Sequence, residues 1–401
     1  MCTGARGGML GEMTALPAWA EWNTAAAGRP WTIGLEEEVL LVDPVTLAPA
    51  SESRAVLDAL PAPLAGHVFQ ETHACVLELV TGPNDDVPAA AGELVGLRRA
   101  LSAVLRDLGL SGGVAGTHPL AVWDQIEISD GERYGVVRES MRELARREPT
   151  CALHVHVAVP GAEAAIRALA GLREDLPLLL ALSANSPYWQ GRDTGLASAR
   201  IPILAMFPRV SIPPPVSSYG EYVAAVELLT ASRAVADPSF IWWDARLRPH
   251  IGTVEVRIMD AQTTMAETAG LAALVQCLVR HHAVEPAPGE LTAEALAENR
   301  FIASRDGIAA QLIRAQPPHL EPAADRLART LSDCAPLAAE LGCAHELEGL
   351  AALLAQPGHA RQRSIARRDG LDAVVVDLAT AFGCPPDAGS GTRRQALTAP
   401  L

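Results

Sequence analysis

The 401-residue chain contains no lysine, and all 32 of its basic residues are arginine. A catalytic Schiff-base lysine and a P-loop lysine are therefore excluded, so arginine, a metal ion or backbone N–H groups would have to hold any bound phosphate. The chain has 47 acidic residues and a net charge of −15. This charge argues against nucleic acid or an anionic membrane as the main partner, and we expect small-molecule substrates instead.

Long apolar runs and closely spaced cysteines are also missing. The richest apolar run, residues 176–184, is too short to cross a bilayer and contains Pro177. The seven cysteines are scattered and form no Cys-x-x-Cys motif, which favours reduced thiols in a cytoplasmic protein. Residues 1–30 lack the pattern of a signal peptide, in agreement with that location. These features neither favour nor exclude a homo-oligomer.

The two ends of the chain differ in composition from the rest. Residues 1–29 and 384–401 are rich in small and polar residues, so we predict that both are disordered and dispensable for stability. Residues 30–383 are then expected to form a single domain. Strand patterns concentrate before residue 261 and helical patterns after it, which predicts an α+β fold with a helical C-terminal third.

Apolar residues at helical spacing, separated by proline and glycine, predict the helices of this fold. The expected ranges are 52–60, 87–108, 130–147, 162–183, 217–236, 264–285, 292–314, 321–341, 344–355 and 359–382. Pro177 is expected to break the 162–183 helix into two pieces, because proline cannot donate the backbone hydrogen bond of a helix interior.

Residues 31–43 combine a buried strand pattern with three consecutive acids. They read Trp-Thr-Ile-Gly-Leu-Glu-Glu-Glu-Val-Leu-Leu-Val-Asp, and Pro44 follows. Because side chains alternate along a strand, Glu36 and Glu38 share one face, whereas Glu37 points the other way. Neighbouring carboxylates repel each other, so a divalent metal ion is a natural partner for this pair. An exposed edge strand with solvated acids is the alternative.

Three further expected strands carry charged or titratable residues on one face. They hold Glu78 in residues 74–81, His154 and His156 in residues 151–159, and Glu255 and Arg257 in residues 252–261. If these strands share a sheet, four carboxylates and a histidine converge with an arginine. Such an oxygen-rich set favours Mg²⁺ or Mn²⁺ over zinc and suits a nucleoside triphosphate bound through its metal ions, with arginine at the transferring phosphoryl group.

Other interpretations of these residues stay open. The His-x-His pair is typical of zinc sites but also occurs in purely structural positions, and Glu255 with Arg257 could form a solvated cross-strand pair. Two other classes of protein therefore remain: a metal-dependent hydrolase that uses His154 and His156 without ATP, and a catalytically silent relative that binds ATP and metal.

Several motifs in the same order resemble those of the YbdK-type carboxylate–amine ligases. These enzymes belong to the glutamate–cysteine ligase type 2 family, which is related in fold to glutamine synthetase. The matching segments are residues 33–38, 77–81, 116–119, 154–157, 182–189, 193–195, 253–257, 298–300 and 360–363. The resemblance covers about residues 30–382 and implies a curved antiparallel sheet whose concave face holds ATP and Mg²⁺, with helices packed on the outside.

The resemblance also implies roles for individual residues. The metal and phosphate ligands would be Glu36, Glu38, Glu78, His154 and Glu255, with Glu71 as a weaker match. Arg257 would meet the transferred phosphoryl group, acting in catalysis with Glu255, and Arg300 would help to bind the nucleotide. Arg200, Asn185, Arg133 and Tyr134 would lie on the substrate side. The implied reaction joins the side-chain carboxylate of glutamate to cysteine, with release of ADP and phosphate.

Overall fold

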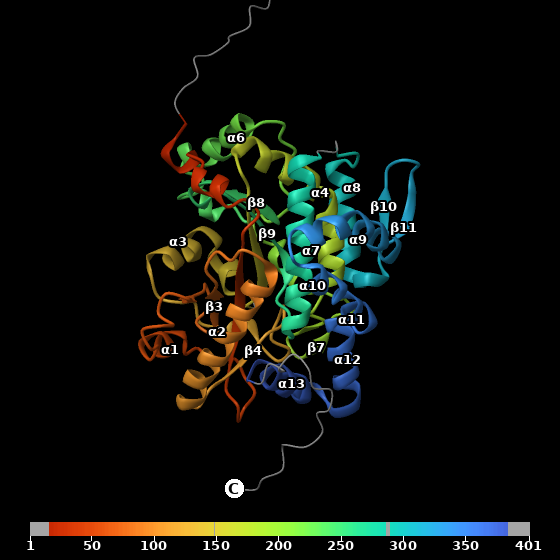
Figure 1. The fold of residues 1–401 in the computed structure, drawn as a ribbon. Coiled ribbons are helices and arrows are strands. Elements are labelled where there is room, and N and C mark those ends of the chain that lie inside the picture. The colour runs from red at the N-terminus through yellow and green to blue at the C-terminus, as the bar shows by residue number, and fades with distance from the viewer. Residues whose placement is uncertain (1–15, 148, 286–288, 384–401) are drawn as a thin grey trace, which may run out of the picture.

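The computed structural model describes residues 16–147, 149–285 and 289–383 (Figure 1). The strands are β1 (Ile33–Val42), β2 (Val68–Gln70), β3 (Val76–Val80), β4 (Ser111–Gly113), β5 (Ala152–Ala158), β6 (Tyr188–Trp189), β7 (Arg192–Asp193), β8 (Ala245–Arg248), β9 (Thr253–Asp260), β10 (Gln311–Arg314) and β11 (His319–Pro322). The predicted disordered tail, residues 384–401, and the first 15 residues of the predicted N-terminal extension lie outside the described ranges.

Helices make up most of the chain after β9. The helices are α1 (Ser53–Asp58), α2 (Val87–Asp107), α3 (Glu132–Met141), α4 (Ala162–Ser183), α5 (Arg200–Leu204), α6 (Tyr219–Ala231), α7 (Met265–Val284), α8 (Ala293–Asp306), α9 (Ala323–Glu340), α10 (Ala344–Glu348), α11 (Leu350–Ala355), α12 (Gly358–Asp369) and α13 (Leu371–Gly383). Short 3-10 helices include η1 (Ala18–Ala20), η2 (Thr24–Gly28) and η6 (Pro249–Ile251). Among the described residues, no helix combines the length and apolar character needed to cross a membrane.

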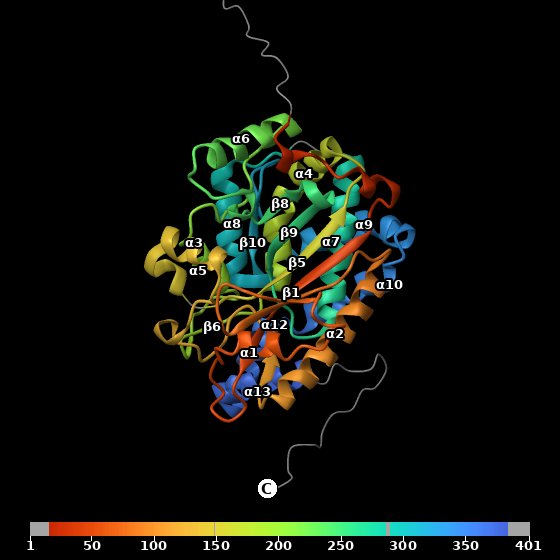
Figure 2. The ribbon, with the colours of Figure 1, turned by 90° about the vertical axis from the view of Figure 1, so that its left-hand side faces the viewer.

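One antiparallel sheet organises the fold, with the strand order β2-β3-β1-β5-β9-β8 and β4 paired to the end of β1. Figure 2 shows β1, β5, β9 and β8 side by side across the middle of the molecule. The register places Glu38 opposite Glu78 and His156 opposite Glu255. Strands that are distant in sequence therefore bring their polar residues to one face, here called the open face, and the predicted α+β class is confirmed.

The opposite face of the sheet, here called the closed face, is covered by helices. Its side chains are mainly aliphatic, and Leu35, Leu77, Val155 and Val256 are each at most 1% exposed. Helices α2, α4 and α7 pack against these strands, and a continuous core runs through all of them. This arrangement follows from the alternation along each strand, because an aliphatic face is stabilised by burial against helices.

An ion pair between β1 and α2 interrupts this apolar core. Glu37 points to the closed face, as predicted, and meets Arg98 of α2, and both side chains are at most 1% exposed. Arg98 Nε donates to the Glu37 carboxylate at 2.6 Å, and the guanidinium also donates to the backbone carbonyls of Gln262 and Thr263 at 2.8 and 3.1 Å. Every charge of this pair is thus matched within the protein.

Some of the predicted elements are wrong. Helix α4 runs without a break through Pro177, because nearly every residue around it is buried against neighbouring elements. The helix expected to reach residue 314 ends at Asp306, and the hairpin β10–β11 follows. The last predicted helix is divided into α12 and α13 at Gly370, whose φ of 90° favours glycine. Strand β8 was not predicted at all.

Residues 16–28 do not form the disordered extension that we predicted. They lie against α6, where Trp19 Nε1 donates to the Glu227 carboxylate at 2.8 Å and the Tyr219 hydroxyl donates to the Ala20 carbonyl at 2.6 Å. Ala20 is fully buried. The composition of the segment is misleading because its few aromatic residues provide enough contact surface to hold it in place.

Candidate active site

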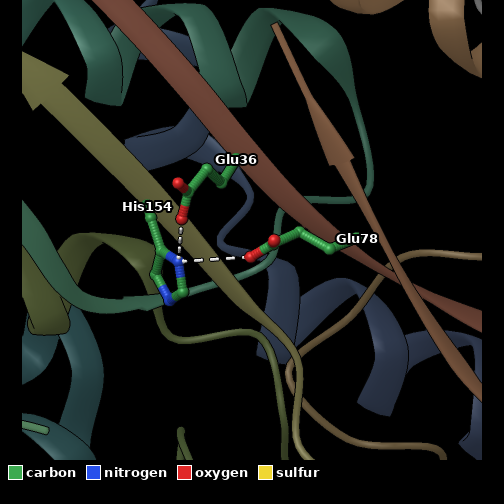
Figure 3. Close-up of side chains that lie close together, drawn as sticks. All are labelled: Glu36, Glu78 and His154. Atoms are coloured by element: carbon green, nitrogen blue, oxygen red, sulfur yellow. Dashed lines mark hydrogen bonds and ion pairs between the residues drawn. The ribbon is translucent and has the colours of Figure 1, made fainter. Parts of the chain in front are cut away.

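The open face of the sheet carries a cluster of carboxylates and histidines (Figure 3). His154 Nδ1 lies 2.9 Å from one oxygen of Glu36 and 3.8 Å from a Glu78 oxygen. The other Glu36 oxygen lies 3.0 Å from His156 Nε2. Burial, together with the charge of Arg257, lowers the pKa of His154 to about 4. The His154 ring is therefore neutral near pH 7 and can offer a nitrogen lone pair to a metal ion.

A second part of the cluster consists of carboxylates alone. Glu38, Glu71 and Glu78 each place an oxygen within 4.8 Å of the others. Burial and the neighbouring carboxylate of Glu71 raise the pKa of Glu38 to about 8, even though the Ala152 N–H donates to Glu38 at 2.6 Å. Burial and the charges of Glu36 and Glu71 likewise raise the pKa of Glu78. These groups repel one another unless a cation lies between them.

The donor atoms fit Mg²⁺ or Mn²⁺. The described residues include three groups of potential ligands: Glu36, Glu78 and His154; Glu36, His156 and Glu255; and Glu38, Glu71 and Glu78. Neighbouring groups share Glu36 or Glu78, so the face could hold more than one ion. Oxygen ligands predominate, and this is the chemistry that hard divalent cations prefer.

Glu255 lies at the edge of this cluster and is surrounded by arginines. Arg246 Nε donates to the Glu255 carboxylate at 2.6 Å and Arg248 Nη1 at 3.2 Å, while Arg257 forms a very short contact. Burial alone would raise the pKa of the fully buried Glu255, but the charges of Arg246 and Arg257 hold it well below its usual range. Glu255 is therefore ionised, and its arginine neighbours supply a fixed positive field beside the carboxylates.

Arg246 and Arg248 were not predicted as site residues. They lie on β8, which we missed, and the alternation of Arg246, Leu247 and Arg248 was the available signal. Arg246 lies opposite Glu255 in the register of β8 and β9. The side chains alternate in the same way as in the other strands, so a short strand next to residues 252–261 would have placed both arginines beside Glu255.

A cavity of about 420 Å³ lies at one end of the cluster. Glu36 and His156 line it, and the same strand faces continue as Gly34, Ala158 and Val80. Along the open face the side chains thus change from charged to small and apolar. Such a surface suits a flat, weakly polar group that is attached to a charged one.

A second cavity, of about 150 Å³, lies beside Glu38, which follows Glu36 by two residues on β1. Its charged and titratable lining comprises Glu38, Glu71, His73, Arg133, His154, Arg200, Asp244 and Arg257, and its apolar lining includes Val137, Ile203, Phe207, Trp242 and Trp243. Arg257 is thus shared between the carboxylate cluster and this cavity. The cluster separates the two cavities.

The remaining predicted residues have different surroundings. Arg133 lines the second cavity and stacks on Phe240, and the neighbouring Tyr134 donates its hydroxyl hydrogen to the Gln70 carbonyl. Arg200 also lines this cavity, but it donates to the carbonyls of Arg257 and Ile258 at 3.0 and 2.9 Å. Their predicted contacts with a substrate remain predictions.

Asn185 and Arg300 lie apart from the carboxylate cluster. The fully buried Asn185 amide donates to the Ala261 carbonyl at 2.9 Å and accepts from Gln362 at 2.8 Å. Arg300 forms a two-point ion pair with Asp244, at 2.7 and 3.0 Å. These contacts give Asn185 and Arg300 structural partners, and their predicted contacts with substrate and nucleotide remain predictions.

Comparison with known proteins agrees with this geometry. The family model described as glutamate–cysteine ligase family 2 matches residues 32–380. A protein of Rubrobacter xylanophilus named "Putative glutamate--cysteine ligase 2-1" is 39% identical over 350 residues, covering 86% of this chain and 93% of the relative. A protein of Sorangium cellulosum, "Putative glutamate--cysteine ligase 2", is 36% identical over 356 residues, covering 87% and 95%. The chain therefore belongs to glutamate–cysteine ligase family 2, as its motifs predicted.

Solved structures show the same fold at much lower sequence identity. The glutamate–cysteine ligase of Francisella tularensis, solved in complex with AMP, has a TM-score of 0.68 at 14% identity and covers 88% of each chain. A bifunctional glutathione synthetase from Pasteurella multocida has a TM-score of 0.61 at 14% identity, covering 88% of this chain and 51% of the neighbour. The fold predicted from the resemblance is confirmed.

Proposed function

We propose that the protein is an ATP-dependent ligase that joins a carboxylate to an amine through an acyl phosphate, with release of ADP and phosphate. The observation that carries this proposal is the position of the carboxylate cluster, which lies between an apolar cavity and a charged one. Such an arrangement suits phosphoryl transfer, because the acceptor oxygen attacks the phosphorus from the side opposite to the leaving nucleotide. Membership of the ligase family supports the same reaction.

The first cavity would hold the nucleotide. Its small apolar surface next to Glu36 and His156 suits a purine base and a ribose whose phosphates extend towards the cluster. Glu36, Glu38, Glu78, His154 and Glu255, with Glu71, would hold Mg²⁺ or Mn²⁺ there. Bound metal ions would neutralise the phosphate charge and align the terminal phosphoryl group for transfer.

The second cavity would hold the carboxylate and the amine. Arg257 reaches from the cluster into this cavity, where it can stabilise the charge that develops on the transferred phosphoryl group. Arg133 and Arg200 could pair with carboxylates of the substrates. The names of the relatives suggest glutamate and cysteine as the two substrates. The chain lacks lysine altogether, so no amine side chain is available to form a covalent acyl-enzyme.

Isotope transfer tests the proposed chemistry. The protein would be incubated with ATP, Mg²⁺ and a substrate carboxylate labelled with ¹⁸O, across a panel of amino acids and amines. We expect ADP and phosphate, with one labelled oxygen per turnover in the phosphate, because the carboxylate oxygen leaves with the phosphoryl group. Release of AMP would indicate an acyl adenylate instead. Turnover without ATP would favour the hydrolase that uses His154 and His156.

A further inference from the structure

Residues 17–29, here called the N-terminal strap, line the first cavity although they precede the family match. The match begins at residue 32, yet Asn23, Ala25 and Arg29 contribute to the cavity that contains Glu36 and His156. Residues within the family match thus form most of the cavity lining, and the strap forms the rest. A bound molecule that fills this cavity would contact both.

The strap is held in place by specific contacts at two points. Its first half is fixed to α6 by Trp19 and Ala20, and Trp22 packs edge-on against Tyr219 with ring centroids 6.0 Å apart. Its second half is fixed to η6, because the Asn23 N–H donates to the Pro249 carbonyl at 2.8 Å. These anchors make the strap a defined surface.

Asn23 also links the strap to the opposite rim of the cavity. Its side-chain amide nitrogen donates to the His250 carbonyl at 3.0 Å, and its side-chain oxygen accepts from the Ala25 N–H at 2.9 Å. The next residue of η6, Ile251, lines the same cavity and is 42% exposed. Asn23 therefore fixes the N-terminal strap relative to η6, so that these two parts of the cavity lining keep their positions.

Arg29 is the charged residue that the strap contributes to the cavity. It pairs with Asp85, which follows β3, and the two side chains are 58% and 77% exposed. Exposed ion pairs of this kind contribute little to stability, so Arg29 can change partner at little cost. A nucleotide oxygen would be a stronger partner, because a guanidinium binds phosphate in a charge-assisted way.

We propose that the N-terminal strap is part of the nucleotide-binding site, with Arg29 as a contact to the ribose or phosphate oxygens and Asn23 as a positioning residue. This inference rests on the proposed function, which places the nucleotide in the first cavity. It adds a wall that lies outside the residues matched by the family model and predicts that nucleotide affinity depends on residues before position 30.

Nucleotide titration of point variants tests the proposal. Calorimetry with Mg²⁺ and ATP should show a Kd about tenfold higher for Arg29→Ala, and about threefold higher for Asn23→Ala, than for the unaltered protein. The KM for the carboxylate should change less than the Kd for ATP, because neither residue lines the second cavity. Arg54→Ala is the matched control, because Arg54 and Asp58 form a similarly exposed ion pair away from the cavity.

Hydrogen exchange gives a second readout that is independent of turnover. Adding ATP and Mg²⁺ should slow amide exchange in residues 20–29, whereas the β10–β11 hairpin should exchange at an unchanged rate. An unchanged Kd in both variants, or no added protection of the strap, would overturn this proposal alone. Failure of the unaltered protein to bind ATP at all would overturn the proposed function as well.

Discussion

Glutamate side chains on the two faces of strand β1 have opposite surroundings. On the closed face, Glu37 has Arg98 as a partner, and Arg98 is bonded in turn to two backbone carbonyls. On the open face, Glu38 lies opposite Glu78 and close to Glu71, so that three carboxylates face one another. The closed-face carboxylate thus has a cationic partner within the protein, whereas burial and neighbouring carboxylates raise the pKa values of Glu38 and Glu78 on the open face.

The largest expected effect comes from removing a charge on the open face. Glu36→Gln should lower kcat by at least about a thousandfold, because Glu36 belongs to two of the three potential ligand groups. The melting temperature should fall only slightly, since glutamine keeps the size of the side chain and can still hydrogen-bond to His154 and His156. ADP formation and thermal unfolding would be measured beside Glu348→Gln, a change at an exposed site on α10. Full activity in Glu36→Gln would contradict the assignment of the cluster.

The matching change on the closed face should act on stability instead. Glu37→Ala leaves Arg98 buried without its partner, which should lower the free energy of unfolding by about 3–5 kcal/mol. The kcat per folded molecule should stay close to that of the unaltered protein, because Glu37 points away from the cavities. Urea unfolding and active-site titration measure the two quantities. An equal loss of kcat in Glu36 and Glu37 variants would show that the two faces are not independent.

Arg257 tests whether the positive charges on the open face act on the reaction itself. Arg257→Lys keeps a cation but loses the planar pair of donors, so kcat should fall roughly a hundredfold. Arg248→Lys is the control, because Arg248 contacts Glu255 but does not line the second cavity. Steady-state kinetics decide the role. A rise in KM at constant kcat would mean that Arg257 only holds the substrate in its ground state.

The smallest expected effect is the response of stability to metal ions. Mg²⁺ or Mn²⁺ at ten times its Kd should raise the free energy of unfolding by about 1.4 kcal/mol, since it binds only the folded cluster. The same addition should stabilise Glu36→Gln less, because only the group of Glu38, Glu71 and Glu78 keeps all its ligands. Thermal unfolding with and without a chelator checks this. Equal stabilisation of both proteins would place the bound ion elsewhere.

The sequence was most informative where a long strand alternates strictly. The pattern in residues 31–43 and 151–159 predicted which side chains share a face, and the structure confirms that Glu36, Glu38, His154 and His156 do so. This worked because alternation along a strand depends only on local geometry. Which strands are neighbours was not predictable in the same way, since pairing depends on contacts between distant parts of the chain.

The failures share that physical cause. The partner of Glu37 is 61 residues away on α2, so no local pattern indicated it. Pro177 is accommodated because the packing of α4 outweighs its local cost, and four residues of β8 were too few to give a strand signal. The N-terminal strap was missed because anchoring by Trp19 and Trp22 depends on α6, which lies about two hundred residues further along the chain.

The buried pair of Glu37 and Arg98 also limits how this sequence can change over generations. Replacing both residues with well-packed aliphatic ones of similar volume is often neutral or stabilising for such pairs. Replacing either one first costs several kcal/mol, a large part of the stability of a typical domain. A lineage that mutates one position at a time must therefore pass through a poorly folded ancestor. The pair can persist through this barrier even if it contributes nothing to the stability of the present protein.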